Sequence, residues 1–213
     1  MAIVRQYRTF AGHPGFAFLV FMVSFVLEMA SAIDLYLLIP KFCLKRNDCS
    51  VYSVARILLV WLLCLLSVFL HELGHAFGYW LTARKARWTI LAGSGPKILC
   101  TEKYTFCILP VGGYFSPGEE PKAKKEKLMM LAGGPFASLL LTALFCICRF
   151  CLFGSASQGN ALYEILLPVS NFLLCFNFFQ FLFTLIPVRY RIVCRGLESD
   201  GLQMVHVLKS KKR

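Results

Sequence analysis

Charged side chains are scarce in this chain of 213 residues. Asp, Glu, Lys and Arg together make up 16% of it, whereas they make up about a quarter of an ordinary soluble domain. Hydrophobic residues account for 58%, and the mean hydropathy is +0.65. So few charges among so many apolar residues exclude an ordinary soluble domain and indicate a membrane protein.

Acidic residues are rarer than basic residues. The 11 Asp and Glu residues stand against 23 Lys and Arg residues, which gives a net charge of +12. Nucleic-acid-binding proteins share such an excess, but here the basic residues cluster between apolar runs, as membrane flanks do, and no nucleic-acid-binding motif is present. We therefore expect the partner of the basic segments to be a lipid bilayer and not a nucleic acid.

Four apolar runs are long enough to cross a bilayer, which takes about 20 helical residues. They predict an all-α polytopic membrane protein, a single membrane-embedded domain over residues 1–213, with transmembrane helices at about 16–39, 54–83, 128–153 and 161–187. Residues 88–116 alternate β-favouring residues with Gly and Pro, which predicts a small membrane-associated β-hairpin or sheet between the second and third helices. Residues 188–213 form a basic tail.

The distribution of basic residues also predicts an orientation. With four spans, the N-terminus, the segment 84–127 and the tail share one side, and that side holds most of the 23 Lys and Arg residues. Because cytoplasmic segments carry such an excess, we expect a multi-pass protein with both termini in the cytoplasm. The membrane we expect is the bacterial cytoplasmic membrane, although the charge distribution does not reveal the source organism. Cys43 and Cys49 share a loop on the other side, and they can form a disulfide there if that side is oxidising.

The second predicted span carries the most informative motif, at residues 71–75. On a helix, His71 and His75 lie one turn apart on the same face, so both imidazoles can bind one metal ion. Glu72 lies beside them and can take a proton from a metal-bound water. This is the helical H-E-x-x-H arrangement of zinc peptidases, and it predicts one zinc ion per chain. The plainer alternative is a pair of hydrogen-bonded core histidines, but ionisable groups in an apolar span usually mark function.

A catalytic zinc site needs three protein ligands, and this motif supplies two. Of the three Asp residues in the chain, only Asp200 follows the fourth predicted span on the cytoplasmic side, where the motif should lie. Three glutamates in charged flanks share that side and remain alternatives: Glu119, Glu120 and Glu198. Asp200 precedes a glycine, so it can also be a solvated turn residue.

The order of the motifs resembles the site-2 protease family of intramembrane zinc metalloproteases, peptidase family M50. That family has H-E-x-x-H in a transmembrane helix, then a Pro-x-Gly-Gly-Tyr hairpin and an Ala-Gly-Pro-x-Ala-Asn segment. A distal Asp-Gly follows a helix that ends in Asn-Leu-Ile-Pro. The similar segments here are 71–75, 110–114, 132–138, 184–187 and 199–201. The resemblance therefore spans roughly residues 54–205.

This resemblance implies a membrane-embedded zinc endopeptidase acting on transmembrane or membrane-associated peptides. The implied zinc ligands are His71, His75 and Asp200, and the implied general base is Glu72. The implied substrate-binding positions are Gly112, Gly113 and Asn177. The hairpin around the two glycines would offer a strand edge to an extended substrate, or be simply structural. The competing function is a catalytically inactive membrane scaffold or chaperone that keeps the same fold.

Four features depart from the family pattern. Thr184 replaces the Asn of Asn-Leu-Ile-Pro, Ser138 replaces the Asn after the Gly-Pro, and Ser199 replaces the Leu of Leu-Asp-Gly. The interval from Pro187 to Asp200 is also longer than the few residues usual in the family. The sequence predicts no oligomeric state.

Overall fold

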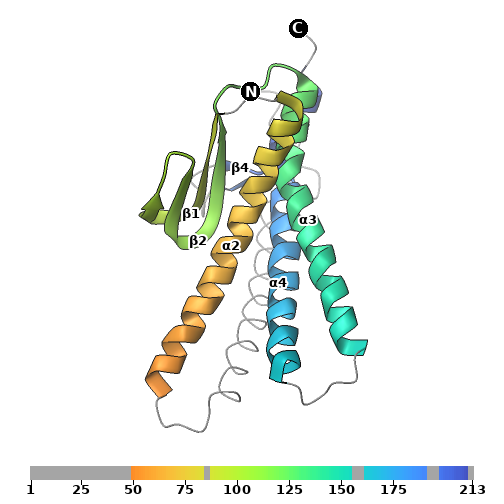
Figure 1. Ribbon diagram of the computed structural model, residues 1–213. Helices are drawn as coiled ribbons and strands as arrows, with labels where there is room; N and C mark the ends of the chain where they lie inside the picture. Colours follow the sequence, from red (N-terminus) through yellow and green to blue (C-terminus); the bar gives the residue numbers. More distant parts are fainter. Residues whose placement is uncertain (1–48, 84–86, 155–160, 191–196, 211–213) are drawn as a thin grey trace.

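Three long helices form the frame of the part of the chain that the structure describes (Figure 1). The structure, a computed structural model, describes residues 49–83, 87–154, 161–190 and 197–210. The long helices are α2 (Cys49–Ala83), α3 (Lys124–Gly154) and α4 (Ala161–Leu185), and the short helix α5 (Asp200–Lys209) follows them. A small β-sheet packs against α2 on the side away from α3. The described part is therefore a helical bundle with one β appendage.

Two of these helices are long and apolar enough to cross a membrane, over Leu58–Thr82 in α2 and Lys124–Cys151 in α3. Their most apolar windows are only 33% and 22% buried, whereas the core helix of a soluble protein is mostly buried. Large apolar side chains are exposed along them, including Leu62, Leu144 and Phe150. Exposed apolar surface of this extent fits contact with lipid.

The other two predicted spans are not among the candidate membrane-crossing helices of the described residues. The side chains of α4 are described only over Val169–Leu185, and this described apolar stretch is by itself too short to count as a span. The first predicted span, at 16–39, and Cys43 lie outside the described residues. Four crossing helices therefore stay a prediction, whereas the helical bundle with a small sheet is confirmed.

The sheet is built from two bent antiparallel strands, β1 (Trp88–Cys100) and β2 (Tyr104–Pro117). The first half of β1 pairs with the second half of β2, from Trp88↔Pro117 to Ala92↔Gly113. The second half of β1 turns back against the first half of β2, ending at Cys100↔Thr105. Gly93 has a φ of 86°, which glycine adopts readily, and it lies where β1 bends. This is the sheet that residues 88–116 predict.

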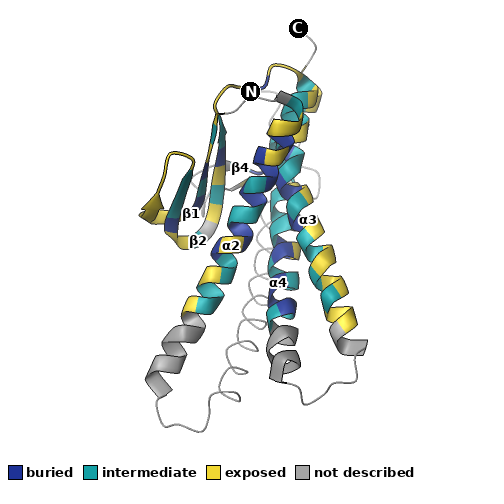
Figure 2. Cartoon of the chain, in the orientation of Figure 1, coloured by how far each residue is buried: buried dark blue, intermediate teal, exposed yellow. Residues whose placement is uncertain are grey.

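Aromatic and aliphatic packing fixes the sheet to α2. Ala76 and Tyr79 of α2 form a buried cluster with Ile90 of β1 and Phe115 of β2. Nearer the start of α2, Leu65 and Val68 pack against Ala92 of β1. Figure 2 shows these buried positions along the sides of α2 that face the sheet and the other helices. The second half of β2 is thereby held beside the middle of α2.

The long interval between Pro187 and Asp200 holds a second, minimal ladder. Strands β3 (Arg189–Tyr190) and β4 (Leu197–Glu198) pair antiparallel and return the chain to the end of α4. The Ser199 N–H then donates to the Val188 carbonyl over 3.0 Å. The β3–β4 ladder and this hydrogen bond therefore bring the start of α5 next to the end of α4.

Candidate metal centre

Helices α2 and α3 cross with their backbones in contact. Gly74 and Gly133 face each other so closely that a Cβ on either would overlap the carbonyl oxygen of the other. A Cβ on Gly78 would overlap the Met129 carbonyl in the same way. Small residues allow helices to approach this closely. The α3 backbone therefore reaches the face of α2 that carries the motif.

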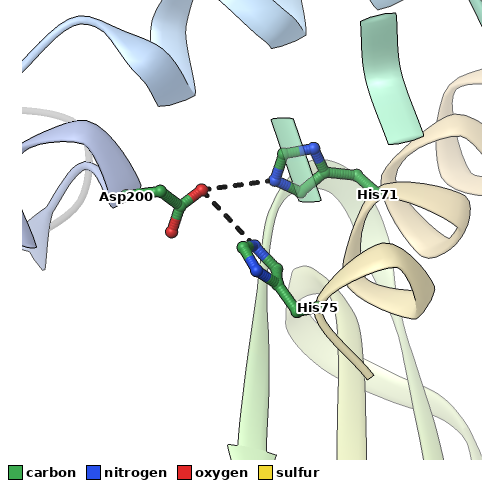
Figure 3. Close-up of side chains that lie close together, drawn as sticks. All are labelled: His71, His75 and Asp200. Atoms are coloured by element: carbon green, nitrogen blue, oxygen red, sulfur yellow. Dashed lines mark ion pairs between the residues drawn. The ribbon is translucent and has the colours of Figure 1, made fainter. Parts of the chain in front are cut away.

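His71, His75 and Asp200 converge at this crossing (Figure 3). The two histidines are 2% and 6% exposed. The Asp200 Oδ2 atom lies 3.5 Å from His71 Nε2 and 3.4 Å from His75 Nε2. One ligand atom from each residue lies within 4.8 Å of the others, and no other such group of His, Cys, Asp or Glu occurs in the described part of the chain.

The charge state of Asp200 suits a metal ligand. Burial by itself raises the pKa of this carboxyl, but imidazoles that carry a proton on Nε2 hold the pKa at about 2 through the charge of His75 and hydrogen bonds from both rings. A zinc ion in place of those protons would favour the ionised carboxylate in the same way. The carboxyl is therefore ionised at neutral pH. An anionic oxygen completes a set of two imidazole nitrogens and one carboxylate, which catalytic zinc sites use.

Gly134 keeps a space open between the three ligands. A Cβ at this position would overlap His75 Nε2 and lie 2.7 Å from His71 Nε2. Any larger residue would therefore fill the place on which the two Nε2 atoms converge. With this space and this donor set, the residues present fit a zinc ion.

Helix α3 also contacts the other nitrogen of each imidazole. His71 Nδ1 lies 2.8 Å from the Ser138 hydroxyl oxygen, and His75 Nδ1 lies 2.8 Å from the Met130 carbonyl oxygen. The Gly134 N–H is 3.3 Å from His75 Nδ1, a longer contact than the one to the carbonyl. Because a carbonyl only accepts, Nδ1 of His75 is the protonated nitrogen, and its Nε2 lone pair is free for a metal.

Glu72 lies between the histidines and the sheet. It is 6% exposed, and a Cβ added to Gly113 of β2 would overlap its carboxylate oxygen and lie 2.8 Å from its Cδ atom. Glycine at 113 therefore gives the carboxylate room beside the strand. The second half of β2 pairs with β1 along one edge, and its other edge has no strand partner among the described residues.

Ser199 fixes the start of α5 and therefore the position of Asp200. Its hydroxyl oxygen accepts from the Val188 N–H and, as the N-cap of α5, from the Leu202 N–H. The hydroxyl donates to the Ile186 carbonyl over 2.7 Å. A Cβ on Gly201 would overlap the Leu185 carbonyl, so α5 also packs closely against the end of α4. Serine in place of leucine thus ties the Asp-Gly segment to α4.

The alternative carboxylates have other neighbours. Glu198 forms ion pairs with Arg189 and His206. The Glu120 side chain is 90% exposed and lies 4.0 Å from Lys127. Glu119 accepts a hydrogen bond from the Tyr79 hydroxyl through its backbone carbonyl. None of these carboxylates belongs to the cluster around the histidines.

Two of the implied substrate-binding residues lie beside this cluster and not within it. Asn177 is fully buried, and its Nδ2 donates to the Leu173 carbonyl and to the hydroxyl of Ser67, one turn before His71. Its Oδ1 has no hydrogen-bond partner in the described part of the chain. Gly112 has a φ of 69° and is exposed at the bend before Gly113. Glycine is favoured there because the conformation is left-handed.

The sequence alone did not predict how Gly134, Met130 and Ser199 contribute to this site. Small residues at 132–134 favour close helix approach, and this is the signal in the sequence that bears on Gly134. Met130 acts through its backbone carbonyl, which every residue type has, so its identity carries no signal. Ser199 was visible only as a departure from the family pattern.

Two buried histidines, a carboxylate and an adjacent buried glutamate in a helical bundle are the arrangement expected of a membrane-embedded metallopeptidase. The model of Peptidase family M50 matches residues 59–209, which include every residue of this centre. The chain belongs to this family, the site-2 protease family of membrane metalloproteases, as its motifs predicted. Comparison with curated proteins and with solved structures found no match.

Proposed function

We propose that this protein is a zinc endopeptidase that cleaves transmembrane or membrane-associated peptides, with both of its termini in the cytoplasm. The observation that carries the proposal is the convergence of His71, His75 and Asp200 on the space beside Gly134. Zinc held by these ligands would polarise the scissile carbonyl and lower the pKa of a bound water. Family membership supports the metalloprotease class.

Glu72 would do the proton transfer. Its carboxylate is buried one residue from His71, in position to accept a proton from the attacking water and pass it to the leaving amine. His75 lies seven residues before Thr82, the end of the apolar stretch, or about 10 Å inside it at ~1.5 Å per residue. Water can therefore reach the site from one membrane face. An inactive scaffold would have no use for this arrangement.

The substrate would bind in an extended form. A transmembrane helix hides its scissile amide in helical hydrogen bonds, so the segment must unwind before it is cleaved. The unpaired edge of β2 lies at Glu72, and a strand added there would present its backbone to the site. Gly112 and Gly113 would allow that approach, and the unpartnered Asn177 Oδ1 would accept a substrate N–H.

Zinc content tests the centre directly. Purified in mild detergent, the wild-type protein should hold about one zinc ion per chain, because three ligands meet at one place. Asp200→Ala should lose most of it, and Glu120→Ala, which removes an exposed carboxylate, should not. The measurement is elemental analysis by mass spectrometry. A wild-type protein without zinc would contradict the proposal, and full retention in Asp200→Ala would remove Asp200 from the ligand set.

Backbone methylation of a substrate tests the strand edge. In a cleaved transmembrane peptide, N-methylation of residues next to the scissile segment should raise KM several-fold at every second position, because a strand turns alternate N–H groups toward its partner. Intervening positions should have little effect, and they are the matched control. The measurement is peptide cleavage in lipid vesicles. If N-methylation raised KM equally at alternate and at intervening positions, the result would contradict strand addition.

A further inference from the structure

One stripe of α3 faces the histidine motif. Met130, Gly134 and Ser138 follow one another at intervals of four residues, so they lie on one face of the helix. Met130 contacts His75 through its carbonyl, Gly134 leaves space at both Nε2 atoms, and Ser138 contacts His71 through its hydroxyl. Each imidazole is therefore held at Nδ1 by α3 and presents Nε2 to Asp200.

The two Nδ1 contacts differ in how they depend on sequence. The partner of His75 is a main-chain oxygen, which remains after any substitution at Met130. The partner of His71 is a side-chain oxygen, which exists only if residue 138 supplies one at that distance. Ser138 is fully buried and His71 is 2% exposed, so water does not readily replace a missing partner.

We infer that Ser138 is a positioning residue for the metal ligand His71: its hydroxyl oxygen accepts the Nδ1 proton and fixes the tautomer whose Nε2 faces Asp200. The inference rests on the zinc centre proposed above. It explains how serine serves at a position where the family pattern has asparagine. Serine is short enough to meet the ring where α2 and α3 are in backbone contact. It also makes the Nδ1 contact of His71, unlike that of His75, depend on the identity of one side chain.

The test compares Ser138→Ala with Ser138→Thr, which keeps the hydroxyl, and with Ser67→Ala. Ser67 is a buried serine of α2 whose hydroxyl accepts from Asn177, whereas the Nδ1 partners of the two imidazoles are Ser138 and Met130, so Ser67 is the matched control. Alanine favours a helix more than serine does, so Ser138→Ala should keep α3 intact. Zinc affinity is measured by competition with a chromophoric chelator. The tautomer of His71 is measured in zinc-free protein by ¹⁵N NMR, with His71→Asn to assign its signals.

Loss of a hydrogen-bond partner of a metal-bound histidine typically weakens metal binding about 10–100-fold, and we expect that loss in Ser138→Ala. Ser138→Thr and Ser67→Ala should bind zinc like the wild type. Zinc-free wild type should show His71 protonated at Nδ1, and Ser138→Ala a mixture of tautomers. Wild-type affinity and an unchanged tautomer in Ser138→Ala would overturn the inference. Equal losses of zinc affinity in the Ala and Thr variants, with an unchanged tautomer, would also overturn the inference. They would show that Ser138 contributes only through its packing. A wild type that binds no zinc would overturn the zinc centre instead, and the tautomer would still report on Ser138.

Discussion

Glu72→Gln is expected to lower the rate of peptide cleavage by about 10²–10⁴-fold, the usual contribution of a general base, and to leave the zinc content unchanged. Glutamine has nearly the same shape as glutamate, so it fits beside Gly113 as the native side chain does. It cannot accept the proton of the attacking water. Because Glu72 is not among the three convergent ligands, its replacement should not release the metal.

Cleavage by this variant is measurable without a known substrate. Cells that produce wild-type protein or Glu72→Gln are compared by labelling new protein N-termini and identifying them by mass spectrometry. Wild type should generate N-termini within or next to apolar segments, and Glu72→Gln should not. Glu120→Gln, which changes an exposed carboxylate, is the control and should match wild type. Identical N-termini from wild type and Glu72→Gln would favour the inactive scaffold.

Gly134→Ala is expected to weaken zinc binding by more than about 100-fold, beyond the usual effect of losing an outer hydrogen-bond partner. The added methyl group would overlap His75 Nε2 and lie 2.7 Å from His71 Nε2. Both imidazoles would have to move, and they cannot do so without losing their contacts to Met130 and Ser138. The helix itself should gain, because alanine is favoured over glycine in a helix interior by about 1 kcal/mol.

Two measurements on Gly134→Ala separate loss of zinc binding from loss of the folded structure. Zinc affinity and the thermal stability of the zinc-free protein are measured for wild type, Gly134→Ala and Phe136→Ala. Phe136 is 58% exposed two residues further along α3, so its truncation should leave the metal site unchanged. Gly134→Ala should remain folded, with a zinc-free melting temperature lowered by several degrees because buried contacts of both imidazoles are lost, and it should still lose zinc. Tight zinc binding by Gly134→Ala would show that the ligands converge elsewhere.

Local chemistry in the sequence was enough to predict much of this centre. The four-residue spacing of His71 and His75 places both on one helical face, and three-ligand chemistry pointed to a distal carboxylate. Among the three aspartates, topology selected Asp200 and left three glutamates as alternatives, and the structure brings Asp200 to the two Nε2 atoms. The sheet over 88–116 was predictable because β-favouring residues and glycines interrupt an otherwise helical pattern.

Other parts had no sequence signal of comparable strength. Strands of two residues, as in β3 and β4, are too short to show alternation, so the path from Pro187 to Asp200 could not be predicted. The contact between His75 and the Met130 carbonyl involves the backbone. The role of Ser138 depends on the distance between α2 and α3. The packing of glycines from both helices sets that distance, so the sequence around residue 138 does not show it.

The position of Asp200 has a consequence for biosynthesis. His71 and His75 lie on the first described helix, whereas Asp200 begins the last. A growing chain therefore carries the histidines and Glu72 long before it carries the third ligand, and folding proceeds from the N-terminal part first. Until α5 has been made and has docked against α4 through Ser199 and Gly201, the proposed zinc centre is incomplete. With the function proposed above, this order of synthesis would keep the unfinished chain from cutting neighbouring membrane segments, including its own.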